Sequence, residues 1–161
     1  MIRRMREQLL SYLPWFVSKA AKIPGVRSIK LLGSITTDKK NPKDIDFLIE
    51  VEDDADLKPL AKLGRQLKGR TMQAGHGADI FLANPQGKYI GRTCSWRECR
   101  PGIRVSCDAL NCGKREYLHD DLKTVDLADA VVQAAFELWP SWERATELPE
   151  DVRKVVSEVR R

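Results

Sequence analysis

The chain has 161 residues, of which 42% are hydrophobic and 32% charged, and its formal net charge is +5 at neutral pH. This length suits one ordinary domain with a sizeable core, and the composition excludes a disordered chain. No apolar run reaches the ~20 residues of a membrane span, and Glu7, Gln8 and Lys19 interrupt any signal-peptide core. We therefore expect a cytoplasmic protein without a membrane segment.

The first half of the chain contains the clearest elements. Apolar residues at helical spacing predict an amphipathic helix over residues 2–22, which Pro14 must kink or divide. VRSIKLL, residues 26–32, predicts a strand that leads into Gly33-Ser34. DIDFLIEV, residues 44–51, is the strongest strand, because its apolar side chains alternate at period two.

Further along the chain, residues 55–69 predict a helix and ADIFLA, residues 78–83, predicts another strand. Residues 85–112 are rich in Gly, Arg and Cys, which indicates an irregular or hairpin-like segment. Residues 125–139 predict a strong helix, and residues 148–161 predict a last one.

These elements indicate one α/β domain, of the α+β kind, over residues 1–161, with a small mixed sheet flanked by helices. Residues 88–115 form a basic insert that holds all four cysteines and seven Lys or Arg against two acids, and residues 116–161 are expected to form C-terminal helices. A basic patch indicates a polyanionic partner, such as nucleic acid or a triphosphate. Solvated loops kept soluble by arginine are the alternative interpretation.

Two carboxylates mark the start of the strongest strand. Asp44 and Asp46 project from the same face of a strand, with their Cα atoms about 6.5–7 Å apart. Carboxylates so placed repel each other unless a cation lies between them, and Mg²⁺ (or Mn²⁺) prefers oxygen ligands. Asp79, at the start of the next predicted strand, is the candidate third ligand of a two-metal site.

The stretch between the first two strands offers phosphate contacts. A glycine at the end of a strand, Gly33, allows close backbone approach to a ligand, and a short helix that begins at Ser34 would direct N–H groups at an anion. Lys39, Lys40 and Lys43 lie in the loop that follows, where they would neutralise a triphosphate.

This order of motifs resembles the DNA polymerase β-like nucleotidyltransferase superfamily, over about residues 26–83. The superfamily has Gly-Ser after a first strand, Asp-x-Asp on the next strand, and a third acid on a later strand. The corresponding residues here are Gly33-Ser34, Asp44-Ile45-Asp46 and Asp79.

The resemblance implies a nucleotidyltransferase-like fold and transfer of a nucleoside monophosphate from an NTP to an acceptor hydroxyl, with release of pyrophosphate. Asp44, Asp46 and Asp79 would ligate Mg²⁺, Asp79 would also help to activate the acceptor, and Gly33 and Ser34 would hold the terminal phosphates. Minimal bacterial members often carry Ala-Arg-Gly directly after Gly-Ser, whereas this chain has Ile-Thr-Thr at residues 35–37. That difference leaves the triphosphate contacts to the loop lysines.

Other interpretations remain open. The acceptor is an RNA end, a partner protein or a small alcohol. The chain is alternatively a non-catalytic nucleic-acid-binding or regulatory protein on the same fold, or the antitoxin-like half of a pair with a small helical partner protein. A solvent-facing aspartate pair that merely closes a loop is the structural alternative.

The cysteines are spaced C-x4-C-x7-C-x4-C at Cys94, Cys99, Cys107 and Cys112. Four cysteines within 19 positions, without a secretion signal, indicate a metal more than disulfides, so we predict a closed, structural Cys₄ zinc site. His119 is a possible replacement ligand, and reduced thiols are the alternative.

Three further side chains have weaker assignments. His76 is either an acid/base or phosphate contact near Asp79 or a polar loop residue. Tyr89 and Trp96, among the basic residues of the insert, are candidates for stacking on the bases of a single-stranded nucleic acid, with local packing as the alternative for Trp96.

Overall fold

The computed structural model describes residues 2–37, 42–73, 75–94, 115–120, 135–141 and 148–159. In these residues a six-stranded mixed sheet packs against helices, which confirms the predicted α+β class with a mixed sheet. The elements in chain order are α1 (Ile2–Ser11), α2 (Leu13–Ala21), β1 (Val26–Leu32), the 3-10 helix η1 (Ser34–Thr36), β2 (Asp44–Val51), α3 (Lys58–Gln73), β3 (Gly77–Ala83), β4 (Tyr89–Thr93), β5 (Leu118–His119), β6 (Phe136–Trp139) and α5 (Glu150–Val159).

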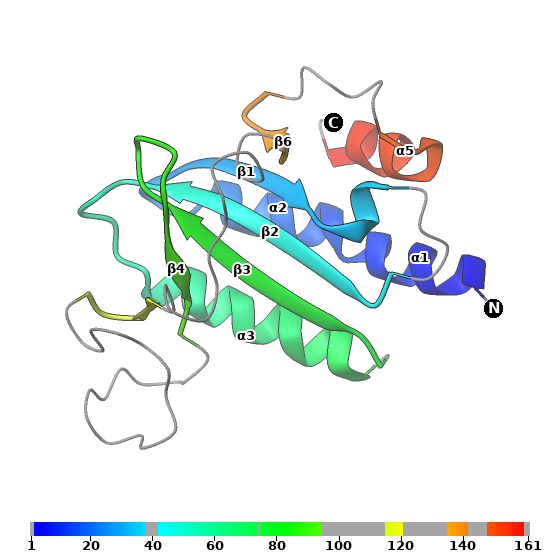
Figure 1. Ribbon diagram of the computed structural model, residues 1–161, viewed down its shortest axis with the longest axis horizontal. Helices are drawn as coiled ribbons and strands as arrows, with labels where there is room; N and C mark the ends of the chain where they lie inside the picture. Colours follow the sequence, from blue (N-terminus) through cyan, green and yellow to red (C-terminus); the bar gives the residue numbers. More distant parts are fainter. Residues whose placement is uncertain are drawn as a thin grey trace.

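The strands lie in the order β5-β4-β3-β2-β1-β6. Strands β2 and β3 run parallel, and all other neighbours are antiparallel. A parallel pair needs a crossover connection, and α3 supplies it. Figure 1 shows α2 and α3 behind the sheet, so that they cover the same face, and α5 above α2 in this view, where it contacts α1 and α2.

The core lies between this face and the helices. Ile45, Phe47 and Ile49 alternate along β2 and are fully buried there. The ring of Phe16, on α2, stacks on Phe47 with centroids 4.1 Å apart. Because side chains alternate along a strand, Asp44 and Asp46 must project from the opposite face of the sheet.

The helices largely follow the sequence pattern. The predicted helix over residues 2–22 is divided as expected, since α1 ends at Ser11 and α2 has Pro14 in its first turn, where a missing N–H costs no helical bond. The strands predicted over residues 26–32 and 44–51 are confirmed at both ends. None of the helices in the described parts of the chain is long and apolar enough to cross a membrane.

The predicted helix over residues 125–139 is wrong at its end. Residues 136–139 form β6, which pairs antiparallel with β1 at the edge of the sheet. Phe136 and Leu138 are buried, whereas Glu137 and Trp139 are half-buried, which is the period of a strand. Residues 125–134 lie outside the described residues.

The predicted division of the second half also changes. Part of the Cys-rich insert over residues 88–115 is β4, a regular strand that pairs with β3 and β5. The segment over residues 116–161, predicted as helices, contains β5 and β6 as well as α5. Both strands extend the sheet and form hydrogen bonds with the backbone groups at its edges. The local sequence pattern that predicted helices contains no information about this pairing.

Candidate functional site

Strand β2 presents the first two aspartates on the face opposite the helices. Asp44 is exposed at the start of the strand, and Asp46 is half-buried two residues later. Ile45, between them, is fully buried in the helix-facing core. The alternation that buries Ile45 therefore fixes the direction of both carboxylates.

Strand β3 brings Asp79 beside them. The parallel register pairs Asp46 with Asp79 and Asp44 with Gly77. Residues paired across a sheet project from the same face, and neighbouring strands are about 4.7–4.9 Å apart. A Cβ atom on Gly77 would collide with Oδ1 of Asp44, so this glycine leaves room for the Asp44 carboxylate. Three carboxylates thus share one small area of the sheet.

Asp46 is the most perturbed of the three. Burial raises the pKa of Asp46 to about 7, the carboxylates of Asp79 and then Asp44 act in the same direction, and the backbone N–H of Asp79 opposes them by donating a hydrogen bond. Its Oδ1 atom is buried and has no hydrogen-bond partner among the described residues. A buried oxygen without a partner, beside two further carboxylates, is the environment that a hard cation relieves.

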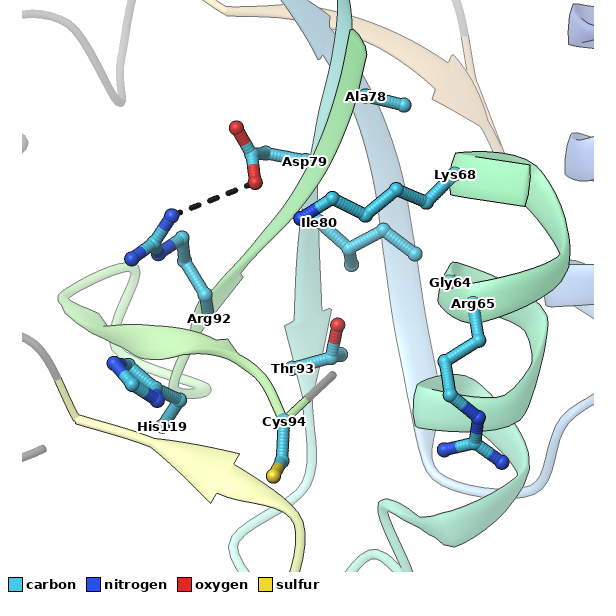
Figure 2. Close-up of a pocket in the computed structure, with 10 residues that line it drawn as sticks. All are labelled: Gly64, Arg65, Lys68, Ala78, Asp79, Ile80, Arg92, Thr93, Cys94 and His119. Atoms are coloured by element: carbon cyan, nitrogen blue, oxygen red, sulfur yellow. Dashed lines mark hydrogen bonds and ion pairs between the residues drawn. The ribbon is translucent and has the colours of Figure 1, made fainter. Parts of the chain in front are cut away.

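The present side-chain positions do not complete a metal centre. Within residues 2–37, 42–73, 75–94 and the other described ranges, no three His, Cys, Asp or Glu side chains are arranged so that they would hold one ion. Asp79 instead forms an ion pair with Arg92 of β4, with Oδ1 3.5 Å from the guanidinium (Figure 2). The donor atoms suit Mg²⁺ in type, and one of the three carboxylates, Asp79, has an arginine as its cation.

The Gly33-Ser34 corner lies next to this cluster. Leu32, the last residue of β1, pairs with Asp46, and a Cβ atom on Gly33 would stand 3.2 Å from Oδ2 of Asp46. Gly33 has φ +87°, a conformation that other residues rarely adopt. The predicted short helix at Ser34 is present as η1, three residues long. The chain therefore turns away from β1 directly beside the Asp46 carboxylate.

A buried arginine binds the backbone directly after the Gly33-Ser34 corner. Arg6, on α1, donates to the carbonyl oxygens of Ile35 and Thr37 at 3.2 and 3.0 Å. The same guanidinium pairs with Asp151 of α5, with Nε 2.9 Å from Oδ2 and Nη2 3.2 Å from Oδ1. Arg6 is only 9% exposed, so it links η1 to two helices as a fixed support. Sequence analysis missed it because a basic residue in an N-terminal helix normally faces solvent.

The lysines predicted to neutralise a triphosphate are only partly placed. Lys43 is exposed directly before Asp44, and its carbonyl oxygen accepts a hydrogen bond from the Gly77 N–H at 3.0 Å. Lys39 and Lys40 lie outside the described residues.

His76 is buried rather than exposed in a polar loop, with 7% of its surface accessible. Its backbone N–H donates to the carbonyl of Thr71, at the end of α3, and its Nδ1 has no hydrogen-bond partner among the described residues. The structure therefore packs His76 at the start of β3, immediately before Gly77.

Of the four predicted zinc ligands, only Cys94 is described. It is half-buried at the end of β4, where its backbone N–H donates to the carbonyl of Tyr117. Cys99, Cys107 and Cys112 lie outside the described residues, so the zinc site stays a prediction. His119, the suggested replacement ligand, lines the same cavity as Cys94 (Figure 2).

The prediction that Tyr89 stacks on nucleic-acid bases is wrong. Tyr89 is 6% exposed, and its ring packs against Phe81 at 6.0 Å between centroids. Trp96 lies outside the described residues.

The comparison with protein families matches residues 2–103 to DUF6932, which is described as a family of unknown function. The chain belongs to DUF6932. The matched segment contains Gly33, the three aspartates and Arg92, whereas β5, β6 and α5 lie beyond it. Searches of curated proteins and of solved structures found no match. Membership of DUF6932 therefore assigns no activity to the chain.

Proposed function

We propose that the chain is a metal-dependent nucleotidyltransferase with the arrangement of the DNA polymerase β-like superfamily. The observation that carries the proposal is the environment of Asp46. Its buried Oδ1 has no partner in the described chain, Gly33 lies against its other oxygen, and Asp79 is its register partner on a parallel strand.

In the proposed site, Asp44 and Asp46 would hold Mg²⁺ (or Mn²⁺), with Asp79 as a further ligand once it leaves Arg92. Bound there, the metal would neutralise the phosphate oxygens and polarise the bond that breaks. The raised pKa of Asp46 means that metal binding must displace a proton from this carboxyl near neutral pH.

The chain's own residues would position the substrates. Gly33 and Ser34 would bind the terminal phosphates of the NTP, and Lys43, with Lys39 and Lys40 of the same loop, would add positive charge. The acceptor hydroxyl oxygen would attack the α-phosphorus and form a new P–O bond, while the bond from the α-phosphorus to the bridging oxygen of pyrophosphate breaks. Asp79 would take the hydroxyl proton, and pyrophosphate would leave with the electron pair.

The acceptor is an RNA end, a partner protein or a small alcohol, and a small helical protein is a candidate partner. We place the reaction in the cytoplasm, where NTPs are available. The zinc predicted at the four cysteines would be structural, because a closed Cys₄ site leaves no position for substrate.

One observation favours a second candidate, a non-catalytic nucleic-acid-binding or antitoxin-like regulatory protein. Arg92 supplies a cation from the chain itself to Asp79, the third carboxylate. A permanent ion pair there would leave a basic surface on the fold without a complete metal site.

The test is transfer of label from each α-labelled NTP to cellular RNA or protein, with and without Mg²⁺ or Mn²⁺. The proposal expects metal-dependent transfer by the wild type and none by the Asp44→Asn, Asp46→Asn double variant. The matched control is Asp53→Asn with Asp54→Asn, which removes two exposed carboxylates in the turn after β2. No transfer by the wild type with any nucleotide would favour the non-catalytic candidate.

A further inference from the structure

A cavity of about 130 Å³ opens between α3 and the β3–β4 pair (Figure 2). Asp79 and residues of α3 line it, whereas Asp44 and Asp46 do not. The residues that line it are Gly64, Arg65, Lys68, Ala78, Asp79, Ile80, Arg92, Thr93, Cys94 and His119.

Two glycines, Gly64 and Gly91, position the walls of this cavity by letting neighbouring elements approach closely. The pairing of β3 with β4 extends from Ala83 back only to Phe81, so β3 and β4 separate beside Ile80. Helix α3 approaches the sheet at Gly64, where a Cβ atom would stand 3.0 Å from Ile80 and 3.1 Å from Thr93. Because α3 lies this close to the sheet, two later residues of the helix, Arg65 and Lys68, line the cavity.

The second glycine sets the opposite wall. Gly91 has φ +139°, and a Cβ atom there would stand 2.6 Å from the carbonyl oxygen of His119. Only a residue without a side chain lets β5 lie this close to β4. The imidazole of His119 is thereby held at the cavity.

The lining is strongly cationic. Arg65, Lys68 and Arg92 are basic, and Asp79 is the only carboxylate among the ten lining residues. The pair formed by Asp79 and Arg92 is long, at 3.5 Å, and both side chains are partly exposed. No described acid lies within ion-pair distance of the Lys68 ammonium, which Figure 2 shows directed toward Ile80 and Asp79.

We propose that this cavity binds one phosphate group of the acceptor. Guanidinium groups bind phosphate oxygens through paired N–H donors, and lysine adds a compact point charge. Pockets for drug-sized ligands are about 300–1,000 Å³, so this cavity fits a single small group rather than a whole nucleotide. The term acceptor rests on the proposed function, in which Asp79 takes the acceptor proton; a phosphate in this cavity would lie next to that carboxylate.

The bound phosphate group belongs either to a phosphodiester of an oligonucleotide or to a small phosphomonoester, and the experiment has one arm for each. Binding is measured without NTP or Mg²⁺, so that it does not depend on transfer. One arm follows the fluorescence anisotropy of a short labelled single-stranded RNA, and the other follows calorimetric titration with inorganic phosphate. The variants are Lys68→Ala and the matched control Lys62→Ala, an exposed lysine on the same helix that does not line the cavity.

We expect Lys68→Ala to weaken binding of at least one probe about tenfold or more, as the loss of one charged hydrogen bond should. For RNA, the salt dependence should fall by about 0.7 in log–log slope, the value for one lost phosphate contact on a single strand. Lys62→Ala should change binding less than twofold. RNA binding that depends on Lys68 identifies an oligonucleotide, and phosphate binding that depends on Lys68 without RNA binding identifies a phosphomonoester.

Equal losses in Lys68→Ala and Lys62→Ala, or no binding of either probe by a folded wild type, would overturn the proposal. Label transfer that persists while both probes fail to bind would overturn the phosphate site alone. Lys68-dependent binding without any transfer would leave the site standing and contradict only the nucleotidyltransferase assignment.

Discussion

Gly33 lies directly against Asp46, close enough that a Cβ atom on the glycine would stand 3.2 Å from the Oδ2 atom of the aspartate. This contact joins the corner after β1 to the carboxylate on β2. A side chain at residue 33 would crowd the Asp46 carboxylate, so the glycine is what lets the corner lie this close. The corner and the Asp46 carboxylate are therefore neighbours in the fold, as the proposed nucleotide site requires.

Replacing Gly33 with Ala should disturb Asp46 as well as strain the backbone. Gly33 has φ +87°, so a side chain there should lower the free energy of unfolding by about 1–2 kcal/mol. Gly87→Ala is a matched control, because Gly87 has φ +79° and no atom within 4 Å of a built Cβ. Both variants should lose similar stability in chemical denaturation, but only Gly33→Ala should lose nucleotide transfer. Equal activity in the two variants would separate the corner from the site.

The raised pKa of Asp46 predicts the sign of a stability change. The folded chain holds this proton up to about pH 7, whereas the unfolded chain releases it near the ordinary value of 3.8. The folded state therefore binds more protons between these values, so the free energy of unfolding should fall as pH rises from about 4 to about 7 and stay low above. Asp46→Asn removes this cost and should stabilise the metal-free protein by about 2 kcal/mol near pH 8, with little effect near pH 4.

The measurement is urea unfolding in chelated buffer, and Asp54→Asn, at an exposed turn position, is the control. If Asp46→Asn were no more stable than the wild type near pH 8, Asp46 would not carry a buried, repelled charge.

Magnesium should act through the same proton. Because an ion must displace the Asp46 proton, adding Mg²⁺ should raise the melting temperature more at about pH 8 than at about pH 6. The Asp44→Asn, Asp46→Asn double variant should show no such rise at either pH. Differential scanning fluorimetry measures both, and a rise of equal size in the variant would place the ion elsewhere.

The contact between Arg6 and Asp151 should stabilise the backbone after Gly33-Ser34, because Arg6 also binds the carbonyl oxygens of Ile35 and Thr37. Asp151→Asn keeps the shape but removes the charge partner of a buried guanidinium, so it should lower the free energy of unfolding by about 1–2 kcal/mol at neutral pH. This modest figure allows for the 41% exposure of Asp151. The hydrogen bond from Arg6 holds the pKa of Asp151 below 3.8, so its contribution is present above that pH and should fade as pH drops further.

Glu150→Gln serves as the control for this variant, since Glu150 lies in the same first turn of α5. A neighbouring acid at the helix start shares the interaction with the helix dipole, so the difference between the two variants isolates the Arg6 contact. If Asp151→Asn and Glu150→Gln lowered the free energy of unfolding equally, the effect would come from the helix dipole rather than from the Arg6 contact.

The sequence predicted the parts of the fold that depend on local pattern. DIDFLIEV alternates at period two, which gives the bounds of β2 and the side on which Asp44 and Asp46 project. Asp79 could be placed on β3 by its position before an apolar run, and the parallel register then put it opposite Asp46.

The sequence did not predict features that depend on contacts between distant segments of the chain. The strand at residues 136–139 follows a helix-like run, and its pairing with β1, about a hundred residues earlier in the chain, decides its conformation. Arg92 reaches Asp79 only because β4 folds back on β3, and the hairpin-like segment predicted over residues 85–112 did not reveal that register. Arg6 is buried by α5, the last described element, which no local pattern in the first helix shows.

The most direct test of nucleotidyl transfer compares two labels in the same reaction. The protein is incubated with Mg²⁺, cellular RNA and an NTP labelled either at the α-phosphate or at the γ-phosphate. Nucleotidyl transfer predicts that α-label becomes attached to the acceptor while γ-label leaves in pyrophosphate, and that the Asp44→Asn, Asp46→Asn double variant attaches neither. Attachment of γ-label, or attachment of α-label that the double variant retains, would contradict nucleotidyl transfer at these aspartates.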